Sequence, residues 1–235
     1  MLDEIDAVDW GSVPGHPDWY EPERVARGLR ALFEAANLVQ AAEAGSQLGG
    51  GGIVHGHSGA VFPAAVMATP LLLDIAQRGH PAAQDTALGL LDEALSCHPH
   101  AGYTRVAVPG GTAVPICCAI AHHLRDRTDL LAGLGKRGKA LLADAASHWS
   151  FEIGECVAEN NDTAAFGILA GCLPGGVHAA EMHLAGDITM LRELTLEYPP
   201  ADGSREACLR VIARHPGELP PGALLFPASC GDRVH

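Results

Sequence analysis

The sequence has few lysines and no long hydrophobic run. Lys136 and Lys139 are its two lysines, and the acidic residues give the 235-residue chain a net charge of −13. Because such a chain repels phosphate backbones, we expect no nucleic-acid partner and instead a protein or peptide with a basic surface. The apolar run at 64–73 is interrupted and too short to cross a bilayer, so we expect no membrane partner.

The chain also lacks a signal-peptide pattern and the cysteine spacing of common metal motifs. Its first ten residues, MLDEIDAVDW, contain no basic segment followed by an apolar stretch. The seven cysteines form no Cys-x-x-Cys pair, and Cys117 and Cys118 are adjacent. We therefore expect a cytoplasmic protein whose thiols are reduced and mostly serve as small core residues.

Proline and glycine divide most of the chain into segments with helical spacing. In the first of them, Val25, Leu29 and Leu32 recur on one face behind Pro22. No segment alternates apolar and polar residues over five or more positions, and the best strand candidate is 103–108. The pattern thus predicts an all-α protein with helices in the segments 21–40, 69–79, 80–95, 114–135, 136–149, 161–176, 187–200 and 204–217.

Two stretches, 54–76 and 97–121, share a sequence pattern. Each begins His-x-His-small-Gly and continues to a proline, an apolar run and Ile-Ala. The period of about 43 residues, with two helices per unit, is typical of HEAT repeats. Stacked units of this kind share one core.

The segments HGHSGAVFPAAVMATPLLLDIA and IDAVDWGSVPG resemble HEAT-repeat proteins common in actinobacteria, and the resemblance covers 5–147. It implies a right-handed α-α superhelix, an armadillo-like α-solenoid, as a single domain over 1–235. The repeats are clearer in 1–150, and 151–235 would hold divergent repeats or a C-terminal cap. The resemblance implies no catalytic residues. We expect the proline-rich tail, 218–235, to lie extended over the last helices.

The repeated histidines allow two interpretations. In a solenoid, the pair His55 and His57 would lie about 10 Å from the pair His98 and His100, with Cys97 beside the second pair. Such a group could bind zinc, copper or nickel, and it could also contact a substrate or sense pH. The simpler interpretation is a repeated corner, since no carboxylate within these motifs would orient the imidazoles. We expect no cofactor, with a transition metal at these four histidines as the alternative.

A cluster of acidic residues follows the fifth predicted helix. On a helix, Glu152, Glu155 and Glu159 would share one face at i, i+3 and i+7. A solvated face is the simple interpretation. The functional one is an acidic binding stripe with Trp149 as an apolar anchor.

The favoured function is a protein- or peptide-binding solenoid, regulatory or toxin-neutralising in a bacterium. The alternative is a small-molecule enzyme whose groove is lined by the histidines or the acidic stripe, and a Cys156–His148 catalytic pair is conceivable. The glycines at 49–52 precede no Gly-Lys-Ser/Thr and no Gly-x-Ser-x-Gly occurs, so no catalytic motif stands out. An enzyme would show several titratable groups converging in one deep pocket.

Overall fold

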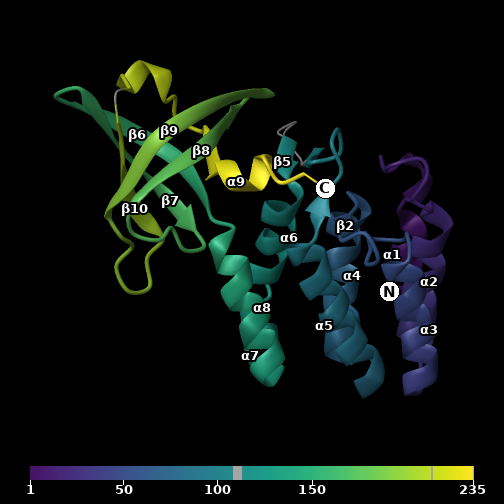
Figure 1. Cartoon of the computed structure of the whole chain (residues 1–235). Coiled ribbons are helices and arrows are strands. Elements are labelled where there is room, and N and C mark those ends of the chain that lie inside the picture. The colour runs from purple at the N-terminus through teal and green to yellow at the C-terminus, as the bar shows by residue number, and fades with distance from the viewer. Residues whose placement is uncertain (108–112, 213, 235) are drawn as a thin grey trace.

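The computed structural model, which describes residues 1–107, 113–212 and 214–234, divides the chain into a helical region and a closed β-barrel (Figure 1). Helices make up 44% of the chain and strands 27%. The last helix of the helical region ends at Ser147, and the first barrel strand begins at Ser150. The predicted all-α superhelix and the HEAT-type family are therefore wrong, because the last third of the chain forms strands that close on themselves.

Two helices of the helical region begin at the prolines that the sequence pattern predicts as helix starts. α2 and α5 begin at Pro22 and Pro81, where the missing N–H costs no hydrogen bond. α4 differs, since it begins at Ala64 and carries Pro70 in its interior. The helices are α1 (Leu2–Ala7), η1 (Trp10–Ser12), α2 (Pro22–Glu34), α3 (Leu38–Gly49), α4 (Ala64–Arg78), α5 (Pro81–Ser96), α6 (Ile116–Arg125), α7 (Thr128–Gly133) and α8 (Gly135–Ser147).

Short strands lie between these helices. β1 (Val54–His55) pairs with β2 (Ala60–Val61), and β2 runs parallel to β3 (His98–Pro99), so the two His-x-His segments are neighbours. β4 (Arg105–Ala107) and β5 (Ala113–Pro115) form a separate antiparallel pair. β4 confirms part of the strand predicted at 103–108, whose last residue lies outside the described residues.

The barrel contains the strands that the sequence pattern did not reveal. Neighbouring strands are antiparallel throughout, in the closed order β10-β7-β6-β11-β8-β9. The helices predicted over 161–176, 187–200 and 204–217 are therefore wrong, and the tail predicted to be extended supplies β11 and then a short helix, α9. The elements are β6 (Ser150–Glu159), β7 (Asp162–Ala170), β8 (Val177–Leu184), β9 (Asp187–Tyr198), β10 (Glu206–Val211), η2 (Pro216–Glu218), β11 (Leu224–Pro227) and α9 (Ala228–Gly231).

Two tight hairpin turns set the register of the barrel. Glu159 pairs with Asp162 across a two-residue turn in which Asn160 has φ 57°. Leu184 pairs with Asp187 across a second turn, where Ala185 and Gly186 have φ 50° and 93°. Left-handed residues in such turns match the twist of the flanking strands.

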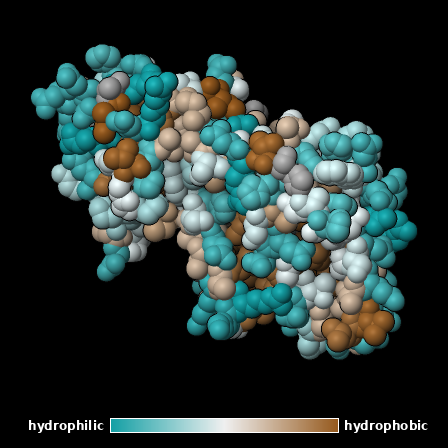
Figure 2. Space-filling view, in the orientation of Figure 1, coloured by the Kyte–Doolittle hydropathy of each residue, from teal (hydrophilic) through white to brown (hydrophobic). Residues whose placement is uncertain are grey.

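Each region has its own hydrophobic core. The helical core is built from the facing sides of the long helices and also takes in Phe226 and Cys230 from the end of the chain. The barrel core contains Trp149, Phe151 and Leu225. The face in Figure 2 is largely hydrophilic, with separate hydrophobic patches. Within the described residues, no helix has the length and apolar character needed to span a membrane.

Candidate metal centre

Three thiols and one imidazole meet where the helical region joins the barrel. Cys117 and Cys118 lie in the first turn of α6, His148 directly follows α8, and Cys230 lies in α9. One ligand atom from each side chain falls within 4.8 Å of the other three. Nδ1 of His148 lies 3.3 Å from Sγ of Cys230. Segments far apart in the sequence thus supply one compact set of metal-ligating atoms.

The backbone around this cluster is held by two arginines. Nη1 of Arg125 donates hydrogen bonds to the carbonyls of Ala145 and His148, each at 2.9 Å, and so fixes the end of α8 against α6. Arg233 donates to the carbonyls of Leu95 (3.2 Å) and Ser96 (2.5 Å), which ties the chain after α9 to the end of α5. The cluster is therefore assembled by contacts that do not themselves require a metal ion.

The three thiols are close enough to share protons. Hydrogen bonds from Cys118 and Cys230 lower the pKa of Cys117, and His148 lowers it further. Burial raises the pKa of Cys118, and the hydrogen bond with Cys117 raises that of Cys230. The three cysteines are buried and His148 is half-buried. Thiols bind a divalent cation as thiolates, so binding of a metal ion at this cluster would release their protons.

The cluster has the composition of a tetrahedral Cys₃His site. Zinc–sulfur bonds of about 2.3 Å place tetrahedral sulfurs roughly 3.8 Å apart. Separations within 4.8 Å therefore need only a small contraction around one ion. Four protein ligands would leave no open coordination position, which is the pattern of structural rather than catalytic zinc.

The predicted histidine site has a different arrangement. The ring of His100 is buried and its centroid lies 4.4 Å from that of Trp19, which also stacks on His16 at 5.0 Å and on His55 at 5.6 Å. His57 meets His55 edge-on at 6.5 Å, and His98 is exposed. Two of the four predicted histidines, His55 and His100, thus pack against one aromatic ring.

Among the described residues, the compact set of three or more potential ligands is the Cys₃His cluster, and none of the four predicted histidines belongs to it. Metal binding at His55, His57, His98 and His100 stays a prediction.

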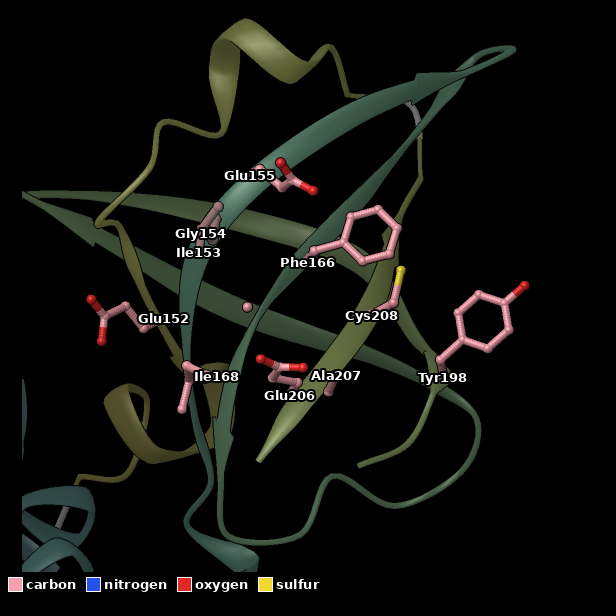
Figure 3. A pocket seen from close by; sticks show the side chains of 11 residues that line it. Glu152, Ile153, Gly154, Glu155, Phe166, Ile168, Tyr198, Glu206, Ala207 and Cys208 are labelled. Carbon is pink, nitrogen blue, oxygen red and sulfur yellow. The ribbon is translucent and has the colours of Figure 1, made fainter. Parts of the chain in front are cut away.

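The predicted acidic stripe lies on a strand and not on a helix. Glu152 and Glu155 line a hollow of about 690 Å³ on the barrel surface, together with Phe166 and Tyr198 (Figure 3). Glu159 forms an ion pair with Arg210 at 2.8 Å.

Trp149, the predicted anchor of the stripe, is 2% exposed and belongs to the barrel core. Its indole is therefore not on the surface, and binding of a basic partner at Glu152, Glu155 and Glu159 stays a prediction.

Cys156 and His148 each have another partner. Sγ of Cys156 donates to the carbonyl of Leu219 at 3.4 Å, whereas His148 faces Cys230. The sequence pattern therefore drew attention to His148 but paired it with Cys156, whereas the structure places it beside Cys230. Sequence reasoning also treated Cys117, Cys118 and Cys230 as core residues, because no local spacing connects them. The adjacent cysteines were the one local signal.

Comparisons with known proteins give no match: no family model, no curated protein and no solved structure matches the chain. The family resemblance drawn from the repeats therefore gains no support. A function must be argued from the geometry of the cluster and its surroundings.

Proposed function

We propose that this protein binds one zinc ion through Cys117, Cys118, His148 and Cys230, and that the ion fastens the barrel to the helical region. The observation that carries the proposal is the convergence of four ligand atoms within 4.8 Å from α6, the end of α8 and α9. Buried cysteines that only fill a core have no need to cluster around an imidazole.

The donor set favours zinc over other common ions. Thiolates and imidazole suit zinc in tetrahedral S/N sites, whereas magnesium and calcium take oxygen ligands. An iron–sulfur cluster is generally held by four cysteine thiolates, and this site offers three and an imidazole. Neutral His148 would bind through Nδ1, the ring atom that faces Cys230.

The positions of the ligands support a tethering role. α9 follows β11, which is a strand of the closed barrel, and α6 and α8 belong to the helical region. α9 crosses between the two regions in Figure 1. One ion bound to all four residues would cross-link the two regions at their junction, and it would stabilise the folded chain by its binding free energy.

Elemental mass spectrometry of the purified protein tests the proposal. We expect one zinc per chain, and loss of most of it in Cys118→Ser and in Cys230→Ser. Cys172→Ser is the matched control, because Cys172 is an exposed thiol outside the cluster. We expect the protein with this substitution to contain as much zinc as the unsubstituted protein.

Metal-free protein whose three cluster cysteines are reduced, after purification in the presence of zinc, would overturn the proposal. So would zinc that survives both cluster substitutions. Mass analysis under non-reducing conditions would reveal a disulfide between cluster cysteines, and that result also counts against a zinc site.

A further inference from the structure

A cleft of about 530 Å³ lies between α6 and the wall of the barrel. Its lining comes from both regions of the chain, and Cys118 of the metal centre forms part of it. The cleft is distinct from the barrel hollow of Figure 3, although Glu152 and Ile168 border both. Besides Cys118 and Glu152, it is lined by Val66, Val114, Ala119, His122, His123, Arg125, Ser150, Ile168, Ala170, Arg205, Leu224 and Phe226.

Basic side chains are concentrated in this cleft, although the whole chain carries a net charge of −13. Arg125 and Arg205 supply two permanent positive charges. The one carboxylate in the lining, Glu152, is exposed to solvent, which screens its charge. His122 lies 3.5 Å from the carboxylate of Asp126, and burial lowers the pKa of His123. The fixed charge of the cleft is therefore positive.

Arg125 has a donor that no described residue satisfies. Its Nη1 donates to the carbonyls at the end of α8, but its Nε is buried without a hydrogen-bond partner in the described parts of the chain. Burial lowers the pKa of Arg125 most; Cys118 and the carboxylate of Asp126 raise it, and the positive charge of Arg205 lowers it by the smallest of the four effects. Two guanidinium groups on the lining of one cleft can both donate to an anion that lies between them.

The rest of the lining is hydrocarbon. Phe226 is 5% exposed, and Leu224 precedes it on β11. Val66 and Ile168 add aliphatic surface from α4 and β7. A hydrated inorganic anion would leave this surface wet, whereas an anion with an apolar body would cover it.

We propose that the cleft binds a small organic acid, with its carboxylate between Arg125 and Arg205 and its hydrocarbon body against Leu224 and Phe226. The proposal does not require zinc in the neighbouring cluster, because neither arginine is one of its four residues, although the cleft shares Cys118 with it. The negative charge of the surrounding surface would repel a polyanion, so we expect the cleft to bind one small anion.

Isothermal titration calorimetry with octanoate tests this site. We expect saturable binding of one octanoate per chain, weakened about tenfold in Arg205→Gln, the loss expected for one charge-assisted hydrogen bond. Arg205 is exposed and has no ion pair in the described parts of the chain, so its replacement leaves the fold intact. Arg192→Gln is the matched control, an exposed arginine of β9 outside the cleft, and we expect it to bind as the unsubstituted protein does.

Two further ligands separate the parts of the proposal. Octan-1-ol, which lacks the charge, and inorganic phosphate, which lacks the hydrocarbon, should both bind at least tenfold more weakly than octanoate. The proposed site would be overturned if octanoate does not bind saturably. It would also be overturned if octan-1-ol or phosphate binds as tightly as octanoate, or if Arg205→Gln and Arg192→Gln weaken octanoate binding equally. Repeating the titration with the Cys230→Ser variant keeps the result separate from the zinc proposal, since the cleft lining does not include Cys230.

Discussion

Glu181 is a carboxylate that is 1% exposed in the wall of the barrel. Arg105 of β4 donates a hydrogen bond to its Oε1, and Nε2 of His183 lies 2.9 Å from its Oε2. A Cβ at Gly231 of α9 would collide with this carboxylate, so the glycine lets α9 pack directly on the ion pair. Removing one member of a buried pair leaves an uncompensated charge, which costs about 3–5 kcal/mol.

We therefore expect Glu181→Gln to lower the free energy of unfolding by about 3–5 kcal/mol at pH 7, measured by urea denaturation. Burial raises the pKa of Glu181, but the hydrogen bonds from His183 and Arg105 outweigh that effect and the pKa is lowered. The contribution of the Glu181 carboxylate to the free energy of unfolding is thus present above the pKa that this group has in the unfolded chain. It is lost as the pH falls through the pKa of the group in the folded protein.

Below pH 5 the difference between the variant and the unsubstituted protein should therefore shrink. Glu206→Gln, which replaces an exposed carboxylate with no ion pair in the described residues, should change stability by less than about 0.5 kcal/mol. A Glu181→Gln effect as small as that of the control would contradict the role of the buried pair.

At the scale of single elements, several helix starts were predictable and the strands of the barrel were not. Pro22 and Pro81 begin helices because proline fits the first turn, and their apolar faces follow in register. The barrel strands lack a clean alternation. β7 has three consecutive buried residues, Thr163, Ala164 and Ala165, and the pairing of β6 with β7 shifts between Ile153 and Glu155. A bulge moves side chains to the other face, so a strand can imitate a helical stripe of glutamates.

The packing of α7 on α8 depends on one glycine. A Cβ at Gly138 would collide with the backbone carbonyl of Leu131, whereas one at Gly133 meets nothing within 4 Å. We expect Gly138→Ala to destabilise the protein by about 1–3 kcal/mol, because the two helices must separate. Gly133→Ala should change stability by less than about 1 kcal/mol or raise it slightly. Urea denaturation of the two variants side by side measures the difference, and equal effects would show that the two helices do not pack this closely.

At the scale of the whole molecule, the predicted helices of the first 147 residues were largely right and the Cys₃His cluster was not found. His148 was considered, but its partners Cys117, Cys118 and Cys230 are brought to it by the return of the chain after the barrel. No local spacing encodes a contact of that kind. The His-x-His repeat was visible because it is local, and the structure packs His55 and His100 against Trp19.

Removal of zinc should weaken the whole molecule. At zinc levels 1,000 times the dissociation constant, binding contributes about 4 kcal/mol to stability, which shifts Tm by roughly 10 °C for a chain of this size. We expect a chelator strong enough to strip the site to lower Tm by about that amount and to speed proteolysis near 148–149, where α8 gives way to β6. The Cys230→Ser variant should show neither response, and a chelator effect of equal size in that variant would place the zinc elsewhere.

The order of the ligands along the chain also has a consequence for biosynthesis. Domains generally fold in the order in which they are made, so the helical region emerges with Cys117, Cys118 and His148 before the barrel exists. Those three residues are the ligand number of a zinc centre with an open position. Until α9 is made, the nascent protein would present three of the four proposed ligands, without Cys230, to oxidants and to competing metals. A shortage of zinc in the cell would therefore act during translation, on chains that have not yet closed.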